Sequence, residues 1–127
     1  MDMENFRIAA TKYTPEIKLD AKNGLIEVSG KSYPENSFEF YQPFMRWIQN
    51  YLKSPAPFTT VNMEIIYFNS SSSKLFFDFF DLLEESKDAT SLTINWIYDP
   101  QNESALEAGE DFMEEFPSLH FHLVEKS

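Results

Sequence analysis

The stretch Val61-Asn-Met-Glu-Ile-Ile-Tyr-Phe-Asn-Ser-Ser-Ser-Ser-Lys74 changes its periodicity halfway along. From Val61 to Tyr67, every second residue is apolar, which is typical of a strand with one buried face. Asn69 and four serines then end this alternation. Apolar residues recur next at helical spacing, so the sequence predicts a helix that begins near Ser71 or Ser72. The residues that carry this spacing are Phe76, Phe79, Phe80 and Leu83.

Hydroxyl groups at a junction between a strand and a helix lie beside backbone N–H groups that have no partner within the helix. Such hydroxyls can cap the helix, and a phosphate on one of them would lie in the favourable field of the helix N-terminus. Ser and Asn are also common at such turns for purely structural reasons. The residue types alone therefore leave open a structural cap and a modification site.

Outward from this junction, strand and helix patterns alternate along the chain. Further strands are predicted around Phe6–Ala10, Ile17–Leu19, Ile26–Val28, Ser91–Tyr98 and Leu119–Leu123, with a hairpin turn at Asn23-Gly24. Helices are predicted over about residues 36–53, 71–86 and 103–116; Pro43 should kink or restart the first, and Asp99 or Asn102 can cap the last. The sequence thus predicts one α/β domain over residues 1–127, with a mixed sheet of about five to six strands and three packed helices.

The composition excludes several classes of function. The chain has 127 residues, a net charge of -11 and no cysteine, so thiol chemistry and thiolate metal sites are excluded. The negative charge disfavours nucleic acids and anionic membrane surfaces as partners. Neither a signal peptide nor an apolar run of about 18 residues is present, which predicts a cytoplasmic protein.

Besides Tyr67-Phe-Asn-Ser-Ser-Ser-Ser-Lys74, several short blocks occur in a fixed order over nearly the whole chain. They are Thr14-Pro-Glu-Ile17, Gly30-Lys-Ser-Tyr-Pro-Glu-Asn36, Phe40-Tyr-Gln-Pro43, Trp47 with Tyr51, Asn95-Trp-Ile-Tyr-Asp99 and Leu106-Glu-Ala-Gly-Glu110. Any one block is a weak signal, but their ordered sum specifically resembles the SiaC family of bacterial regulatory phosphoproteins. The resemblance implies a fold similar to the STAS domain of anti-sigma-factor antagonists.

The resemblance also implies a non-enzymatic partner switch. A dedicated kinase phosphorylates one hydroxyl, and a metal-dependent serine/threonine phosphatase removes the phosphate. The unphosphorylated form binds and activates a diguanylate cyclase, which raises cyclic-di-GMP. The family's phosphoacceptor follows the Asn of Tyr-Phe-Asn and maps to Ser70, with Ser71 as the alternative. The partner-binding residues expected around it are Phe68, Asn69, Ser70, Ser71, Ser72, Lys74 and Phe77.

The physics of a phosphoserine agrees with such a switch. The group carries about -1.5 to -2 charges at neutral pH and accepts hydrogen bonds from N–H donors. Lys74 lies one turn after Ser70 and can pair with it. A partner packed over the neutral hydroxyl would instead meet a bulky dianion after phosphorylation.

Other functions have weaker support from the sequence. An anti-sigma-factor antagonist would use the same kind of switch with a different partner. A small enzyme would have to use the carboxylates of Asp78, Asp81, Glu84 and Glu85 or the pair His120 and His122. No nucleophile–base pair or phosphate-binding loop accompanies them, so we predict no catalytic residue, no metal site and no cofactor. Six acidic residues between Glu103 and Glu115 are either solvated surface or a dock for a basic patch on a partner.

Overall fold

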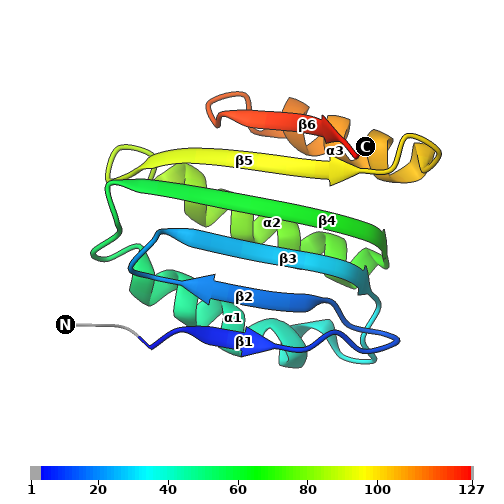
Figure 1. Cartoon of the computed structure of the whole chain (residues 1–127), viewed down its shortest axis with the longest axis horizontal. Coiled ribbons are helices and arrows are strands. Elements are labelled where there is room, and N and C mark those ends of the chain that lie inside the picture. The colour runs from blue at the N-terminus through cyan, green and yellow to red at the C-terminus, as the bar shows by residue number, and fades with distance from the viewer. Residues whose placement is uncertain (1–3, 127) are drawn as a thin grey trace.

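The computed structural model describes residues 4–126, which form one mixed sheet covered by helices (Figure 1). Within these residues the strands are β1 (Phe6–Ile8), β2 (Glu16–Asp20), β3 (Leu25–Ser32), β4 (Phe58–Phe68), β5 (Ser91–Tyr98) and β6 (Phe121–Glu125). The helices are α1 (Ser37–Tyr51), α2 (Ser70–Glu85) and α3 (Glu103–Glu115). The predicted fold class, including the switch from strand to helix after Phe68, is confirmed.

The strands lie in the sheet in the order in which they occur in the chain. The pairs β1–β2 and β2–β3 are antiparallel, while β3–β4, β4–β5 and β5–β6 are parallel. The predicted hairpin between β2 and β3 is confirmed, and Gly24 has a φ of 61°. A Cβ at that position would lie 2.1 Å from the carbonyl oxygen of Phe58, so both the backbone conformation and the space require glycine.

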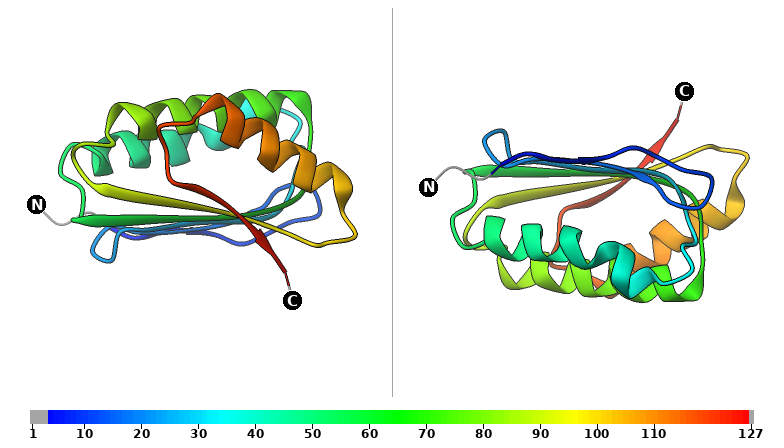
Figure 2. Two further views of the ribbon diagram at one scale, coloured as in Figure 1. Left: turned by 90° about the horizontal axis from the view of Figure 1, so that it is seen from above. Right: turned by 90° about the horizontal axis from the view of Figure 1, so that it is seen from below.

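All three helices lie on the same face of the sheet, as both views of Figure 2 show. Each helix connects two neighbouring parallel strands, and the three crossovers move across the sheet in the same direction. Because such crossovers have the same hand in nearly all proteins, successive steps in one direction place their helices on one side. Each helix follows one of these strands in the chain and therefore begins near the carboxyl end of that strand.

The core lies between the sheet and this helix layer and is rich in aromatic rings. Side chains from β4 (Val61, Met63 and Ile65) and from α2 (Phe76, Phe79, Phe80 and Leu83) are buried there, as the two periodicities predict. At the other end of the layer, α3 approaches β5 closely. A Cβ at Gly109 would lie only 2.4 Å from Cδ1 of Trp96, which is fully buried.

The structure corrects the sequence expectations for the first helix, the first strand and the last strand. Of the two alternatives for Pro43, a kink or a restart, the restart is wrong, because α1 is continuous from Ser37 to Tyr51. Pro43 and Glu39 are both exposed, so water can satisfy the carbonyl left without an N–H partner. The first strand ends at Ile8 and not at Ala10, because the chain turns where the N–H groups of Tyr13 and Thr14 donate to Oγ1 of Thr11. The last strand begins at Phe121, after Leu119.

Candidate functional site

The candidate site is the start of α2, where the strand pattern of β4 ends (Figure 1). The helix begins at Ser70, one residue earlier than expected, and its cap is the Asn69 side chain and not a serine hydroxyl. Asn69 has an extended backbone, and its Oδ1 accepts a hydrogen bond from the Ser72 N–H at 2.9 Å. The carbonyl of Asn69 accepts the N–H of Ser73. An Asn at this position satisfies the first helical donors without using the hydroxyls.

The four serines of α2 consequently have different environments. Ser70 is exposed, and its hydroxyl has no hydrogen bond to any other described residue. Ser71 is also exposed, but its hydroxyl is held by Oδ1 of Asn69 at 3.2 Å and by the Ser37 hydroxyl at 2.8 Å. Ser72 is fully buried, and Ser73 is half-buried.

A chain of buried hydroxyls lies directly beneath this helix start. The Ser32 hydroxyl, at the end of β3, donates to Ser72 Oγ at 2.8 Å and shares a second hydrogen bond with the Tyr41 phenol. Ser37, the first residue of α1, lies 3.2 Å from Ser72 through their Oγ atoms. Burial raises the pKa of the Tyr41 phenol well above its usual range, although the Ser32 hydrogen bond partly opposes this. The phenol therefore stays a neutral hydrogen-bonding group at ordinary pH.

This hydroxyl chain joins β3 and the first turns of α1 and α2. The Ser32 and Ser37 hydroxyls come 40 and 35 positions before Ser72 in the sequence. A buried hydroxyl without a partner would be costly. The network therefore fixes the position of the α2 N-terminus relative to its neighbours. Sequence reasoning missed Ser32, Ser37 and Tyr41, since nothing in their local pattern indicates that they meet.

The residues expected to bind a partner fall into three groups. Asn69, Ser70, Ser71 and Lys74 lie at or near the surface around the helix start. Phe68 and Phe77 are half-buried and pack against α3, with their ring centroids each 6.2 Å from that of Phe112. Ser72 is fully buried, and its hydroxyl instead forms hydrogen bonds beneath this surface with Ser32 and Ser37.

Exposed apolar side chains lie near the carboxyl ends of β3 and β4 and at the start of α1. Tyr67 stands beside Tyr33, which stands beside Tyr13, with centroids 5.5 and 5.2 Å apart in edge-to-face contacts. Tyr67 and Tyr13 are each about half exposed, as is Ile66, and Phe38 near the start of α1 is 68% exposed. Exposed apolar groups concentrated in one region are typical of a protein-binding surface. Tyr13, Tyr33 and Phe38 were not among the residues predicted from the sequence.

The alternative chemical sites are not assembled by the fold. His122 lies on β6 and His120 immediately before it, and both are exposed. Within residues 4–126, no group of three or more His, Asp or Glu side chains is arranged to hold a metal ion. Of the four α2 carboxylates, Asp78, Asp81 and Glu85 are exposed, whereas half-buried Glu84 accepts a hydrogen bond from Ser118.

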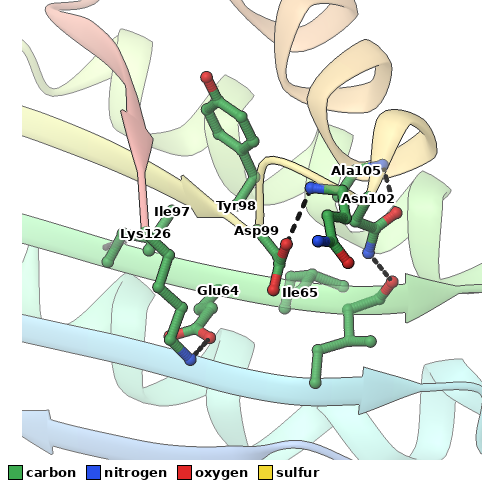
Figure 3. Close-up of a pocket in the computed structure, with 10 residues that line it drawn as sticks. Glu64, Ile65, Ile97, Tyr98, Asp99, Asn102, Ala105 and Lys126 are labelled. Atoms are coloured by element: carbon green, nitrogen blue, oxygen red, sulfur yellow. Dashed lines mark hydrogen bonds and ion pairs between the residues drawn. The ribbon is translucent and has the colours of Figure 1, made fainter.

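A separate cleft of about 380 Å³ lies where β4 and β5 end and α3 begins (Figure 3). Figure 3 shows Lys126 and Glu64 directed toward each other across it, and their charged atoms are 2.6 Å apart. This pairing raises the pKa of Lys126. Asn102, the cap of α3, donates to the carbonyl of Ile66 at 3.0 Å and links the start of α3 to β4. The polar groups of the cleft thus largely satisfy one another.

The fold and the site define a class: a small α/β protein whose mixed sheet has helices on one face and whose central strand leads into an exposed serine at a helix start. Residues 8–126 match the family described as SiaC family regulatory phosphoproteins, and the chain belongs to this family. None of the helices within the described residues is long and apolar enough to cross a membrane.

Individual relatives agree with this assignment. The chain is 33% identical to a protein of Pseudomonas aeruginosa strain UCBPP-PA14 described as uncharacterized, with 89% of this chain and 90% of that protein aligned. SiaC of Pseudomonas aeruginosa has a similar structure, with a TM-score of 0.85, 30% identity and coverage of 98% of both chains. The structure of the diguanylate cyclase SiaD in complex with its activator SiaC from the same organism contains a chain 31% identical to this one; the TM-score is 0.84, with 94% of this chain and 97% of that chain covered.

Proposed function

We propose that this protein is a binding protein without catalytic activity of its own, controlled by phosphorylation of Ser70. The observation that carries this proposal is the difference among the four serines. Only Ser70 combines an exposed side chain with a hydroxyl that is free of hydrogen bonds within residues 4–126. A kinase could reach this hydroxyl without breaking the buried network below it.

The chemistry of the helix start favours a phosphate at this position. Ser70 and Ser71 are the first two residues of α2, and no hydrogen bond occupies their N–H groups within the described part of the chain. Backbone N–H groups and the helix dipole stabilise an anion there. Lys74, four residues after Ser70 on the same side of the helix, supplies a positive charge.

The partner that we propose is a diguanylate cyclase, which the unphosphorylated form binds and activates. Support comes from SiaC of Pseudomonas aeruginosa, described as the activator of the diguanylate cyclase SiaD, and from the similarity of that structure to this one. A dedicated kinase adds the phosphate, and a metal-dependent phosphatase removes it. We place the switch in the cytoplasm, where the nucleotides used by the kinase and the cyclase are found.

Phosphorylation at Ser70 releases the partner in this proposal. A partner packed over Ser70 would have to strip water from about two negative charges, and desolvating an uncompensated charge is costly. The domain need not refold, because the hydroxyl network beneath Ser70 is unaffected by a group added on the outside. An anti-sigma factor in place of the cyclase would use the same switch.

The test uses three variants, the cognate kinase and the purified cyclase. Ser70→Ala should bind the cyclase constitutively. Ser70→Asp should bind it with an affinity between those of Ser70→Ala and the phosphorylated protein, because Asp carries only one charge. Ser71→Ala is the matched control and should still be phosphorylated and released. Phosphopeptide mass spectrometry locates the phosphate, and titration measures affinity. Phosphate found only on Ser71, or equal affinity for all forms, would contradict the proposal. Recovery of an anti-sigma factor from the native host would replace the cyclase as the partner.

A further inference from the structure

A groove of about 420 Å³ lies between α2 and α3, beginning one helical turn beyond Ser70. Ser73 and Phe77 line its α2 side, and they lie three and seven residues after Ser70 on the same side of the helix. Its apolar lining residues, which we call the floor, are Phe68, Phe77, Ala108 and Phe112. Phe112 is buried, while the other three side chains are half-buried and leave apolar surface in the groove.

Three acidic residues of α3 line the opposite side of the groove: Asp111, Glu114 and Glu115. We call them the rim carboxylates. Helix α3 contains no Lys or Arg, and α2 contains only Lys74. None of the rim carboxylates forms an ion pair with another residue between 4 and 126. The rim is thus a patch of uncompensated negative charge beside apolar surface.

The acidic face of α3 is divided by this groove. The rim carboxylates line it, whereas Glu103, Glu107 and Glu110, the other acidic residues of the same helix, do not. The chain therefore contains two triplets of equal charge on one helix, only one of which is next to an apolar floor. If the acidic face served only for solubility, the two triplets would be interchangeable.

We propose that this groove binds a basic amphipathic segment of a protein partner, with large apolar side chains on the floor and Lys or Arg side chains against the rim carboxylates. The rim matches a cationic segment and repels nucleic acids and anionic membranes. An amphipathic helix that lays its apolar side into a groove is a recurring mode of peptide recognition. This inference goes beyond the Ser70 switch and holds even if Ser70 is not the phosphoacceptor.

The probe is a fluorescein-labelled 14-residue amphipathic peptide made of Leu, Ala and Lys, titrated by anisotropy at about 0.15 M salt, near physiological ionic strength. Two matched peptides replace every Lys by Glu or every Leu by Ser. Only the Leu–Lys peptide should bind, because both the charge and the apolar anchors are required. Binding of the Glu peptide or the Ser peptide with similar affinity, or no binding of the Leu–Lys peptide, would overturn the proposal.

Protein variants then locate the site. The triple variant Asp111→Asn, Glu114→Gln, Glu115→Gln should weaken binding of the Leu–Lys peptide roughly tenfold, as expected for three partly exposed charge pairs. The control Glu103→Gln, Glu107→Gln, Glu110→Gln has the same change in net charge and should weaken it less than about twofold. Ala108→Trp fills the floor without changing the charge and should weaken binding by at least the same factor as the rim variant, while Ser104→Trp, on the same helix outside the groove, should not. Circular dichroism verifies that each variant is folded. Equal losses for the two charge triplets, or no effect of Ala108→Trp, would mean non-specific attraction and overturn the proposal.

Discussion

The hydroxyl chain beneath the α2 N-terminus predicts a non-additive pair of mutations. Ser32→Ala removes two hydrogen bonds, one to Ser72 and one to Tyr41, and leaves the Tyr41 phenol, 1% exposed, without a partner. A buried polar group without a partner costs about 1–3 kcal/mol, so we expect a loss of about 2–3 kcal/mol in the free energy of unfolding. Tyr41→Phe should cost only about 1 kcal/mol, because Ser32 keeps its bond to Ser72.

The double variant Ser32→Ala/Tyr41→Phe should be more stable than Ser32→Ala alone. Removing both partners leaves no orphaned phenol, and the expected loss is about 1–2 kcal/mol, well below the sum of the single losses. The assay is urea unfolding at pH 7 and 25 °C followed by circular dichroism, with the exposed Ser104→Ala as a control expected to change stability by less than about 0.5 kcal/mol. If the two losses in the free energy of unfolding simply add, Ser32 is not the hydrogen-bond partner that the buried phenol requires, and the interpretation is wrong.

Three further outcomes are expected. Folding raises the pKa of the Tyr41 phenol. The contribution of this phenol to the free energy of unfolding is therefore fully present below about pH 10, the ordinary pKa of Tyr, and decreases as the pH rises above it. The difference in stability between the unaltered chain and Tyr41→Phe should therefore shrink by about 1 kcal/mol between pH 8 and pH 11, and a constant difference would contradict this. Gly109→Ala should destabilise by about 1–3 kcal/mol in the same urea assay despite alanine's helix propensity, because its Cβ would overlap the buried Trp96 ring; a neutral effect would show that α3 can move away freely. Asn69→Ala should cost about 1 kcal/mol through loss of the α2 cap, whereas Asn69→Asp should be nearly neutral, and equal losses for both would argue against capping.

The local patterns of the sequence predicted most of the elements. The alternation from Val61 to Tyr67 and the helical spacing from Phe76 to Leu83 both depend on which side chains face a core, and period alone distinguishes the two cases. Asn23-Gly24 identified the hairpin, because its turn requires a positive φ that glycine adopts without strain. Boundaries were harder to predict: α2 begins at Ser70 because Asn69 caps it, and the polar run over residues 69–74 does not reveal which residue takes that role.

The sequence by itself determined that a strand leads into a polar helix start at residues 69–74, and family resemblance indicated Ser70 within it. Periodicity and the N-terminal preference for Asn and Ser are local properties, so they can be read without knowing which segments meet. Only the tertiary structure decided how the four serines differ, because Ser32 and Ser37 come from about 35–40 positions earlier in the chain. The same holds for the groove, where the rim carboxylates of α3 and Phe77 of α2 line one hollow although they are more than thirty positions apart in the chain. Contacts between distant segments depend on the packing of the whole sheet and helix layer, and no local pattern encodes them.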